Sequence, residues 1–157
     1  MLVDKSITEF LDELKSEAPT PGGGGVSSLV AANGVALIMM VANLTVTNDK
    51  YKEWHVICDA ILKESQEMLD ELKKCIDQDA KAFDKVLEAY KTKDAEKIAN
   101  AVKKAAEVQE KVIKNSNRAL ELCDALKEHS NPNLETDLKV SEQCLKAATA
   151  SGMALIS

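Results

Sequence analysis

One uncharged stretch limits what this chain can fold into more than any other feature. The residues from Val26 to Val46, VSSLVAANGVALIMMVANLTV, include no Asp, Glu, Lys or Arg. This stretch is long enough to cross a membrane as a helix. It also carries scattered Ser, Asn and Thr side chains, lacks a flanking aromatic belt, and precedes amphipathic segments that need a surface to pack against. We therefore predict the buried central helix of a bundle, with a membrane helix as the alternative.

The composition of the chain removes several classes of function. A length of 157 residues fits one domain, 1–157, that can bury a core without disulfides. The net charge of −6 and the single arginine, Arg118, argue against nucleic-acid binding, which needs a basic face. Four widely spaced cysteines and two histidines give no metal-binding pattern, so we expect no metal. The opening MLVDKSITEF lacks the pattern of a signal peptide, so a cytoplasmic protein is expected.

The remaining sequence predicts helices almost throughout, because Ala, Leu, Lys and Glu dominate and apolar residues recur at helical spacing. A first helix is expected to begin near Ser6, where Ser6 and Glu9 have capping-box spacing. Further helices are expected at about 50–90, at 95–128, and after the turn at 130–133. Short connections between long helices favour antiparallel neighbours, so we predict an all-α, up-and-down bundle. The central helix is apolar on all sides and could also face a second copy, so a homodimer is expected.

The first segment that could carry chemistry is PTPGGGG, from Pro19 to Gly25. Two prolines and four glycines predict a tight loop that opens onto the central helix. Unpaired N–H groups at the start of a helix bind anions, so a phosphate or a carboxylate would suit this place. A flexible linker, or a site where two helices pack closely, is the alternative interpretation.

The second candidate is Asp79, which falls in an apolar stripe of the third predicted helix. The other members of that stripe are Leu72, Ile76, Phe83, Val86 and Tyr90. Asp77 and Asp84 fall outside the stripe and are expected in solvent. A carboxyl group in an apolar setting has its charged form disfavoured, which prepares a general acid or base for work near neutral pH. The alternatives are that the helix phase is off by one residue, that Asp79 pairs with a lysine, or that it caps a neighbouring helix.

Two longer motifs give the chain a family resemblance. APTPGGGGV, from Ala18 to Val26, is followed by MVANLT, from Met40 to Thr45. This pairing resembles the cyclodeaminase/cyclohydrolase family, which comprises the cyclodeaminase domain of formiminotransferase-cyclodeaminase and the methenyltetrahydrofolate cyclohydrolases. The match continues in the family's order with DxxAF, from Asp79 to Phe83, and NPNLETDLKV, from Asn131 to Val140.

The resemblance implies a dimeric, all-helical enzyme that acts on one-carbon tetrahydrofolates without a metal. The implied reaction is hydrolysis of 5,10-methenyltetrahydrofolate to 10-formyltetrahydrofolate. A formiminotetrahydrofolate cyclodeaminase and a non-catalytic folate-binding or structural homologue are the alternatives. Asp79 is implied as the acid or base, with Asp137 as a second catalytic candidate that could instead complement a helix dipole. The residues implied to bind the substrate are Pro21, Gly22, Gly23, Gly24, Phe83 and Asn133.

The chain also departs from the family pattern. Gly25 stands where the family has serine, Gln109 stands where it has proline, and Thr136 replaces the serine before Asp137. The residues GMALIS, 152–157, stand where the family continues into a further helix. The domain is therefore expected to lack the family's last helix.

Overall fold

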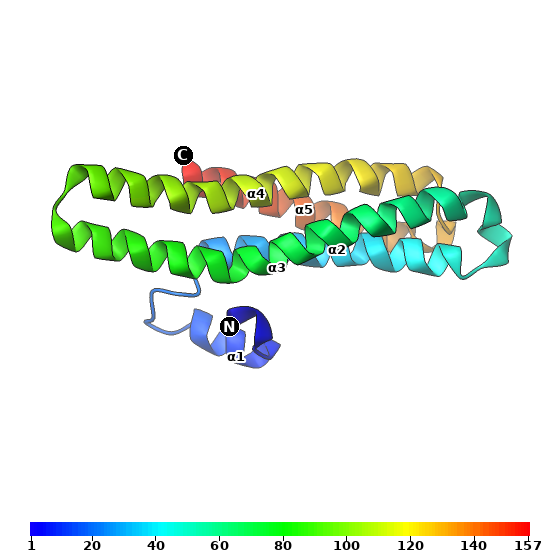
Figure 1. The fold of residues 1–157 in the computed structure, drawn as a ribbon. Coiled ribbons are helices and arrows are strands. Elements are labelled where there is room, and N and C mark those ends of the chain that lie inside the picture. Colours follow the sequence, from blue (N-terminus) through cyan, green and yellow to red (C-terminus); the bar gives the residue numbers. More distant parts are fainter.

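Four long helices run up and down beside one another and form the body of the molecule (Figure 1). The structure, a computed structural model, describes every residue from Met1 to Ser157. In chain order the elements, with η for a short 3-10 helix, are η1 (Leu2–Asp4), α1 (Ile7–Leu14), α2 (Gly23–Val46), η2 (Asp49–Trp54), α3 (His55–Thr92), α4 (Ala95–Glu128), η3 (Pro132–Leu134) and α5 (Glu135–Ile156). Helices α2 and α4 each pack against both α3 and α5. The predicted fold class, an all-α antiparallel bundle, is confirmed.

Helix α2 is the core of the bundle, as its uncharged sequence predicts. It packs against α3, α4 and α5, and its apolar side chains Val35, Ile38 and Val41 are fully buried. A Cβ atom at Gly34 would lie 2.7 Å from Cγ of Leu145, so the glycine lets α2 and α5 approach closely. The helix is long and apolar enough to span a membrane. Here three helices of the same chain pack against it, and 44% of its apolar window is buried.

Two helix boundaries differ from the sequence prediction. The third helix begins at His55 rather than near residue 50, since the chain at Tyr51 leaves helical geometry, with φ −110° and ψ 25°. The Tyr51 side chain turns inward, where its hydroxyl donates a hydrogen bond to Asn131 Oδ1 at 3.0 Å. The predicted loop is also too long, because Gly23–Gly25 belong to the first turn of α2.

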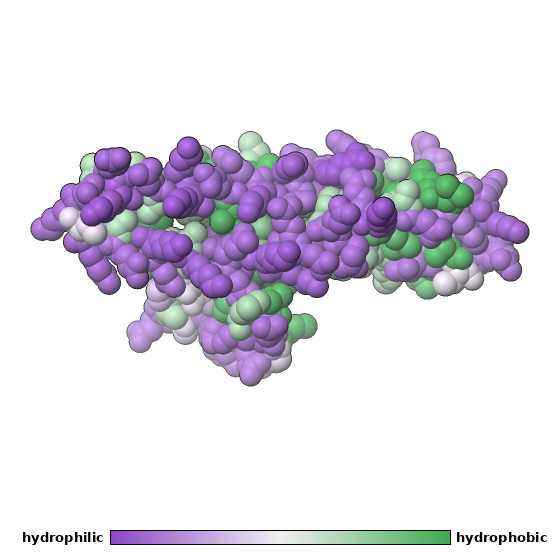
Figure 2. All heavy atoms as spheres, viewed as in Figure 1, coloured by the Kyte–Doolittle hydropathy of each residue, from purple (hydrophilic) through white to green (hydrophobic).

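The N-terminal segment folds beside α3 and corrects one expectation. The predicted capping box of α1 is present, with the Glu9 N–H donating to Ser6 Oγ at 3.2 Å. The Leu2 N–H donates to Asp77 Oδ1 at 2.6 Å. Asp77 is only 7% exposed, so its expected place in solvent is wrong, since a segment from 75 residues earlier covers it. Hydrophobic residues gather where this segment meets the bundle (Figure 2).

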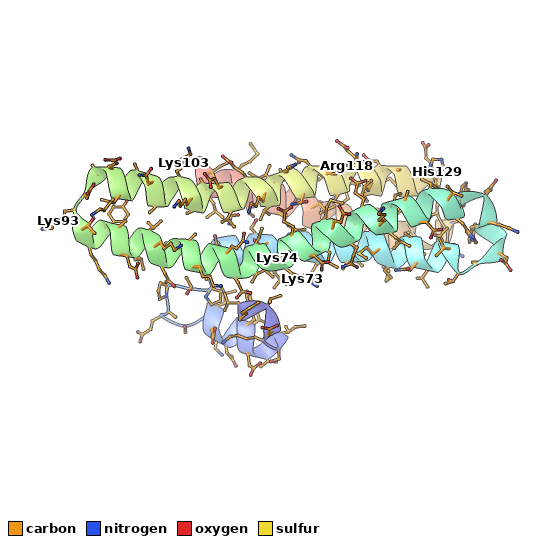
Figure 3. The ribbon with its side chains drawn as sticks, in the orientation of Figure 1. Lys73, Lys74, Lys93, Lys103, Arg118 and His129 are labelled. Carbon is orange, nitrogen blue, oxygen red and sulfur yellow. The ribbon has the colours of Figure 1, made fainter.

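The hairpin of α3 and α4 projects beyond the start of α2, with Lys93 at its tip (Figures 1 and 3). Its outward face is largely hydrophilic (Figure 2). The apolar stripe of α3 is buried as far as Ile76, but Phe83 is 40% exposed and Tyr90 is 58% exposed. Asp79 lies between the buried and the exposed part of this stripe, beside the first turn of α2.

Candidate active site

The first turn of α2 presents N–H groups that have no partner in the backbone. Gly22 is the N-cap residue and has no side chain that could accept a hydrogen bond. The first N–H of this turn with a backbone partner is that of Val26, which donates to the Gly22 carbonyl at 3.1 Å. The N–H groups of Gly23, Gly24 and Gly25 precede it and carry the positive end of the helix dipole. A negative group is favoured in front of this turn.

Asp79 of α3 is that negative group. A Cβ atom at Gly24 would lie 1.9 Å from Asp79 Oδ1 and 2.3 Å from its Cγ atom. Only glycine, whose side chain is a hydrogen atom, fits at position 24 while the Asp79 carboxyl keeps its position. The glycine run is therefore a place of close approach, one of the two alternatives that the sequence left open for it.

The surroundings of Asp79 prepare it to exchange protons. Burial raises the pKa of this carboxyl above its usual range, whereas hydrogen bonds from the Gln109 side chain and the Gly25 N–H act in the opposite direction. The net effect is a raised pKa. No lysine or arginine forms an ion pair with it. The prediction that Asp79 turns inward on its helix is confirmed. Of the other two alternatives, pairing with a lysine is absent, whereas capping of another helix is present, because the carboxyl accepts from the Gly25 N–H at the start of α2.

Gln109 of α4 completes this cluster, although the sequence reasoning did not select it as a site residue. Its Nε2–H donates to Asp79 Oδ1 at 2.9 Å, and its side chain is only 3% exposed. The one available signal was its place beside Val108, in the seam where α4 meets its neighbours. A glutamine there also departs from the family pattern, which has proline at this position.

Other predicted residues lie at the same end of α2. Pro21 directly precedes the N-cap, and its Cβ atom is 3.8 Å from where a Cβ atom of Gly25 would be. Phe83 follows Asp79 by one helical turn on α3, so the two share a face. The partly exposed ring of Phe83 offers a flat apolar surface next to the carboxyl. The structure thus brings Pro21, Gly22, Gly23, Gly24, Asp79 and Phe83 to one end of α2.

Asn133 and Asp137 lie at the other end of the bundle. The N–H of Asn131 donates to Thr45 Oγ1 at 3.2 Å, which places η3 and the start of α5 beside the last turn of α2. His129, just before this segment, marks that end in Figure 3. Gly24 and Thr45 are 21 residues apart on one helix, which corresponds to about 30 Å. Within one chain these two candidates therefore do not share a site with Asp79.

A cationic cavity of about 520 Å³ lies between α3 and α4, and three of its residues, Gln78, Lys81 and Ala82, are close to Asp79 in sequence. Four lysines and one glutamate line it, namely Lys81, Lys85, Lys97, Lys104 and Glu88. Lys97 pairs with Asp94, while the other three lysines form no ion pair. In a chain with a net charge of −6, this is a local excess of positive charge. It suits a ligand with carboxylate groups.

The site can therefore hold and move a proton next to helix N–H groups, with an aromatic ring and a cationic cavity nearby. A carboxyl with a raised pKa can act as a general base when ionised and as a general acid when protonated. No group of three or more His, Cys, Asp and Glu side chains is arranged so that it could hold a metal ion. The arrangement supports acid–base chemistry at a single carboxyl.

Comparisons with known proteins find similar sequences and a similar structure over nearly the whole chain. The profile of the family described as formiminotransferase-cyclodeaminase matches residues 6–157. The chain is 35% identical to the methenyltetrahydrofolate cyclohydrolase of Methylorubrum extorquens, across 90% of this chain and 72% of that protein. It is 26% identical to the formimidoyltransferase-cyclodeaminase of Gallus gallus, across 94% of this chain and 29% of that longer protein. The crystal structure of formiminotetrahydrofolate cyclodeaminase from Thermotoga maritima matches with a TM-score of 0.95 at 31% identity, across 99% of this chain and 78% of that chain.

Proposed function

The chain belongs to the formiminotransferase-cyclodeaminase family, and we propose that it hydrolyses 5,10-methenyltetrahydrofolate to 10-formyltetrahydrofolate. The observation that carries the proposal is the placement of Asp79. Its half-buried carboxyl has a raised pKa and faces the first turn of α2. The relative named a methenyltetrahydrofolate cyclohydrolase gives the reaction class.

The proposed reaction uses Asp79 first as a base and then as an acid. The carboxylate takes a proton from water while the water oxygen bonds to the electrophilic amidinium carbon of the substrate. The carboxylic acid then gives a proton to N5 as the bond between N5 and that carbon breaks. The hydroxyl proton on that carbon leaves to bulk water as the C=O bond forms, so the formyl group stays on N10 and Asp79 returns to its ionised form. Proton transfer by one placed side chain contributes about 10²–10⁴-fold to a rate.

A second candidate function is formiminotetrahydrofolate cyclodeaminase. The structural match to the Thermotoga maritima enzyme favours it. In that reaction N10 attacks the formimino carbon and ammonia leaves, so a carboxyl must move protons between nitrogen atoms around the same carbon. Asp79 could serve either reaction, since both pass through a tetrahedral carbon that bears two ring-forming nitrogens.

Two assays separate these functions. Purified protein is mixed with 5,10-methenyltetrahydrofolate, and the loss of its absorbance is compared with buffer alone. A second assay measures ammonia released from 5-formiminotetrahydrofolate. A rate well above buffer in the first assay alone supports the cyclohydrolase, and ammonia release at a comparable rate supports the cyclodeaminase. No acceleration in either assay contradicts both and leaves a folate-binding or structural protein.

The lysine-lined cavity is proposed to hold the anionic glutamyl tail of the folate. Lys85 of α3 and Lys104 of α4 approach it from opposite sides and form no ion pair. Replacing both with Gln is expected to raise KM for a substrate with several glutamyl residues by about 2- to 30-fold, since each exposed ion pair contributes roughly 0.2–1 kcal/mol. The value of kcat should stay unchanged, and the effect should shrink in high salt.

Steady-state kinetics with substrates of different tail length measure this effect. Lys63→Gln is the matched control, because Lys63 is exposed on α3 and does not line the cavity. An equal rise of KM for short and long tails, or in the control, would place the tail elsewhere.

We also propose that the protein works as a homodimer. Neighbouring apolar side chains are exposed on the single chain, such as Ile7 at 81% and Leu11 at 52%, which lie one turn apart on α1. A second copy packed against such side chains would remove them from water. Light scattering tests this proposal, because a dimer has twice the 17.0 kDa mass of the chain.

A further inference from the structure

Gln109 forms a hydrogen bond through the nitrogen of its side-chain amide but none through the oxygen. Its Nε2–H donates to Asp79 Oδ1 at 2.9 Å, but its Oε1 atom is buried and has no hydrogen-bond partner. A buried carbonyl oxygen without a donor costs about 1–3 kcal/mol. An apolar side chain of the same length would avoid this cost, so packing alone does not account for a glutamine at this position.

The amide of glutamine matches both protonation states of a carboxyl group. An ionised carboxylate only accepts hydrogen bonds, whereas a protonated carboxyl has one O–H that must donate. Half a turn about the terminal torsion of glutamine exchanges Nε2 with Oε1, and this torsion is broad and roughly two-fold. The same side chain can therefore donate to the carboxylate and accept from the carboxylic acid.

We propose that Gln109 is a positioning residue that keeps Asp79 hydrogen-bonded in both of its protonation states. Nε2–H donates to Oδ1 while Asp79 is ionised, and Oε1 accepts the carboxyl O–H after Asp79 has taken up a proton. This inference rests on the proposed function, because Asp79 gains and loses a proton in each turnover of that reaction. Without such a partner, the carboxyl group would lack this hydrogen bond in one protonation state. It would then rotate away from the reacting atoms, either when it takes the proton from water or when it gives the proton to N5.

No ionisable side chain on the neighbouring helices replaces Gln109 as the hydrogen-bond partner of Asp79. Helix α2 has no charged residue, and α5 has none after Lys146. On α4 the neighbours of Gln109 at helical spacing are Ala105, Ala106, Val112 and Ile113. On α3 the residue one turn before Asp79 is Cys75, and burial raises the pKa of its thiol to about 11, so it is neutral at pH 7. Gln109 is therefore the side chain that forms a hydrogen bond with Asp79 both before and after Asp79 takes up a proton.

Carbon-detected NMR of the intact protein tests the exchange directly. The Cγ signal of Asp79 and the Cδ and Nε2 signals of Gln109 are followed across a pH titration. We expect the Gln109 Cδ signal to move with the same midpoint as Asp79 Cγ, because Oε1 begins to accept as the carboxyl is protonated. The protected Nε2–H signal should fade over the same interval. A Cδ signal that stays constant through the titration of Asp79 overturns the proposal.

Kinetic variants test whether the exchange matters to turnover. Gln109→Met keeps the length and removes both polar atoms, so we expect kcat to fall by about 10- to 100-fold with little change in KM, as for other small misplacements of a reacting group. Gln109→Glu places a second carboxyl beside Asp79, and the two carboxyls can bond to each other only while they share one proton. Its rate should therefore show an added loss at alkaline pH that the wild type lacks.

The matched control is Gln66→Met, since Gln66 Nε2–H donates to Asp70 Oδ2 at 3.1 Å on the exposed surface of α3. This control should leave kcat, KM and the pH profile unchanged. Wild-type kinetics in both Gln109 variants would overturn the proposal. If the wild type turns over neither folate, the proposed function fails, and the NMR titration still decides whether Gln109 follows the proton on Asp79.

Discussion

Asp79→Asn is expected to lower the rate of 5,10-methenyltetrahydrofolate hydrolysis by about 10²–10⁴-fold while the protein stays folded. Asparagine has nearly the same shape and can still accept the hydrogen bond from Gln109, but it cannot take up a proton. The loss should appear in kcat, because the substrate meets the same surface. Absorbance decay of the substrate measures the rate, and circular dichroism shows that the helices persist.

The same substitution is expected to raise the melting temperature at neutral pH. The pKa of Asp79 is raised in the folded protein, so between the ordinary and the raised pKa the folded state binds more protons than the unfolded state. Stability from this group therefore falls as the pH increases through that interval. The asparagine of the variant has no charge to bury, so the difference in melting temperature should be small in acid and grow toward pH 7.

Asp84→Asn is the control for this pair of effects, since Asp84 lies on the same helix and is exposed. It should change neither the rate nor the melting temperature appreciably. A folded Asp79→Asn protein with wild-type kcat would show that another group moves the proton. A rate loss without the gain in stability would instead place the carboxyl in a more solvated setting than the structure gives it.

The sequence was sufficient for the bundle and for one half of the site. Helical spacing placed Asp79 on the inner face of its helix, and the glycine run marked the start of the central helix. Both depend on local patterns, a period near 3.6 residues and the special backbone of glycine. Only the structure shows that these two features meet, because a Cβ atom at Gly24 would lie 1.9 Å from Asp79 Oδ1.

The rest of the site depends on contacts between distant segments, which local patterns do not report. Gln109 reaches Asp79 across 30 positions, from a helix whose spacing indicates only a packed seam. Asp77 is buried because Leu2 comes back to it from the N-terminus. Asn133 and Asp137 matched a family motif, yet the length of α2 keeps them about 30 Å from Asp79 within one chain.

Gly24→Ala is expected to reduce turnover by about 100-fold or more, because the new methyl group would occupy the place of the Asp79 carboxyl. The carboxyl must then swing toward solvent, away from the Gly25 N–H and from Gln109. Alanine in a helix is otherwise favoured over glycine by roughly 0.5–1 kcal/mol. Losing the buried hydrogen bond of Gln109 costs about 1–3 kcal/mol, so the melting temperature should fall overall.

Gly23→Ala separates the effect on the helix from the effect on the carboxyl. A Cβ atom at Gly23 would meet only Leu155 Cδ2, at an ordinary contact distance of 3.7 Å. Its melting temperature should therefore equal or slightly exceed that of the wild type. If Gly24→Ala melts like Gly23→Ala and keeps wild-type kcat and KM, the close approach of α2 to Asp79 is not needed for the reaction.

A double variant shows whether Gly24 acts through Asp79. In Asp79→Ala the carboxyl is absent, and most of the space that a methyl group at Gly24 needs is open. Adding Gly24→Ala to Asp79→Ala should then cost little further activity, because both changes remove the same group from the reaction. Losses that multiply in the double variant would mean that Gly24 serves the substrate directly, through its own N–H or through the space above it.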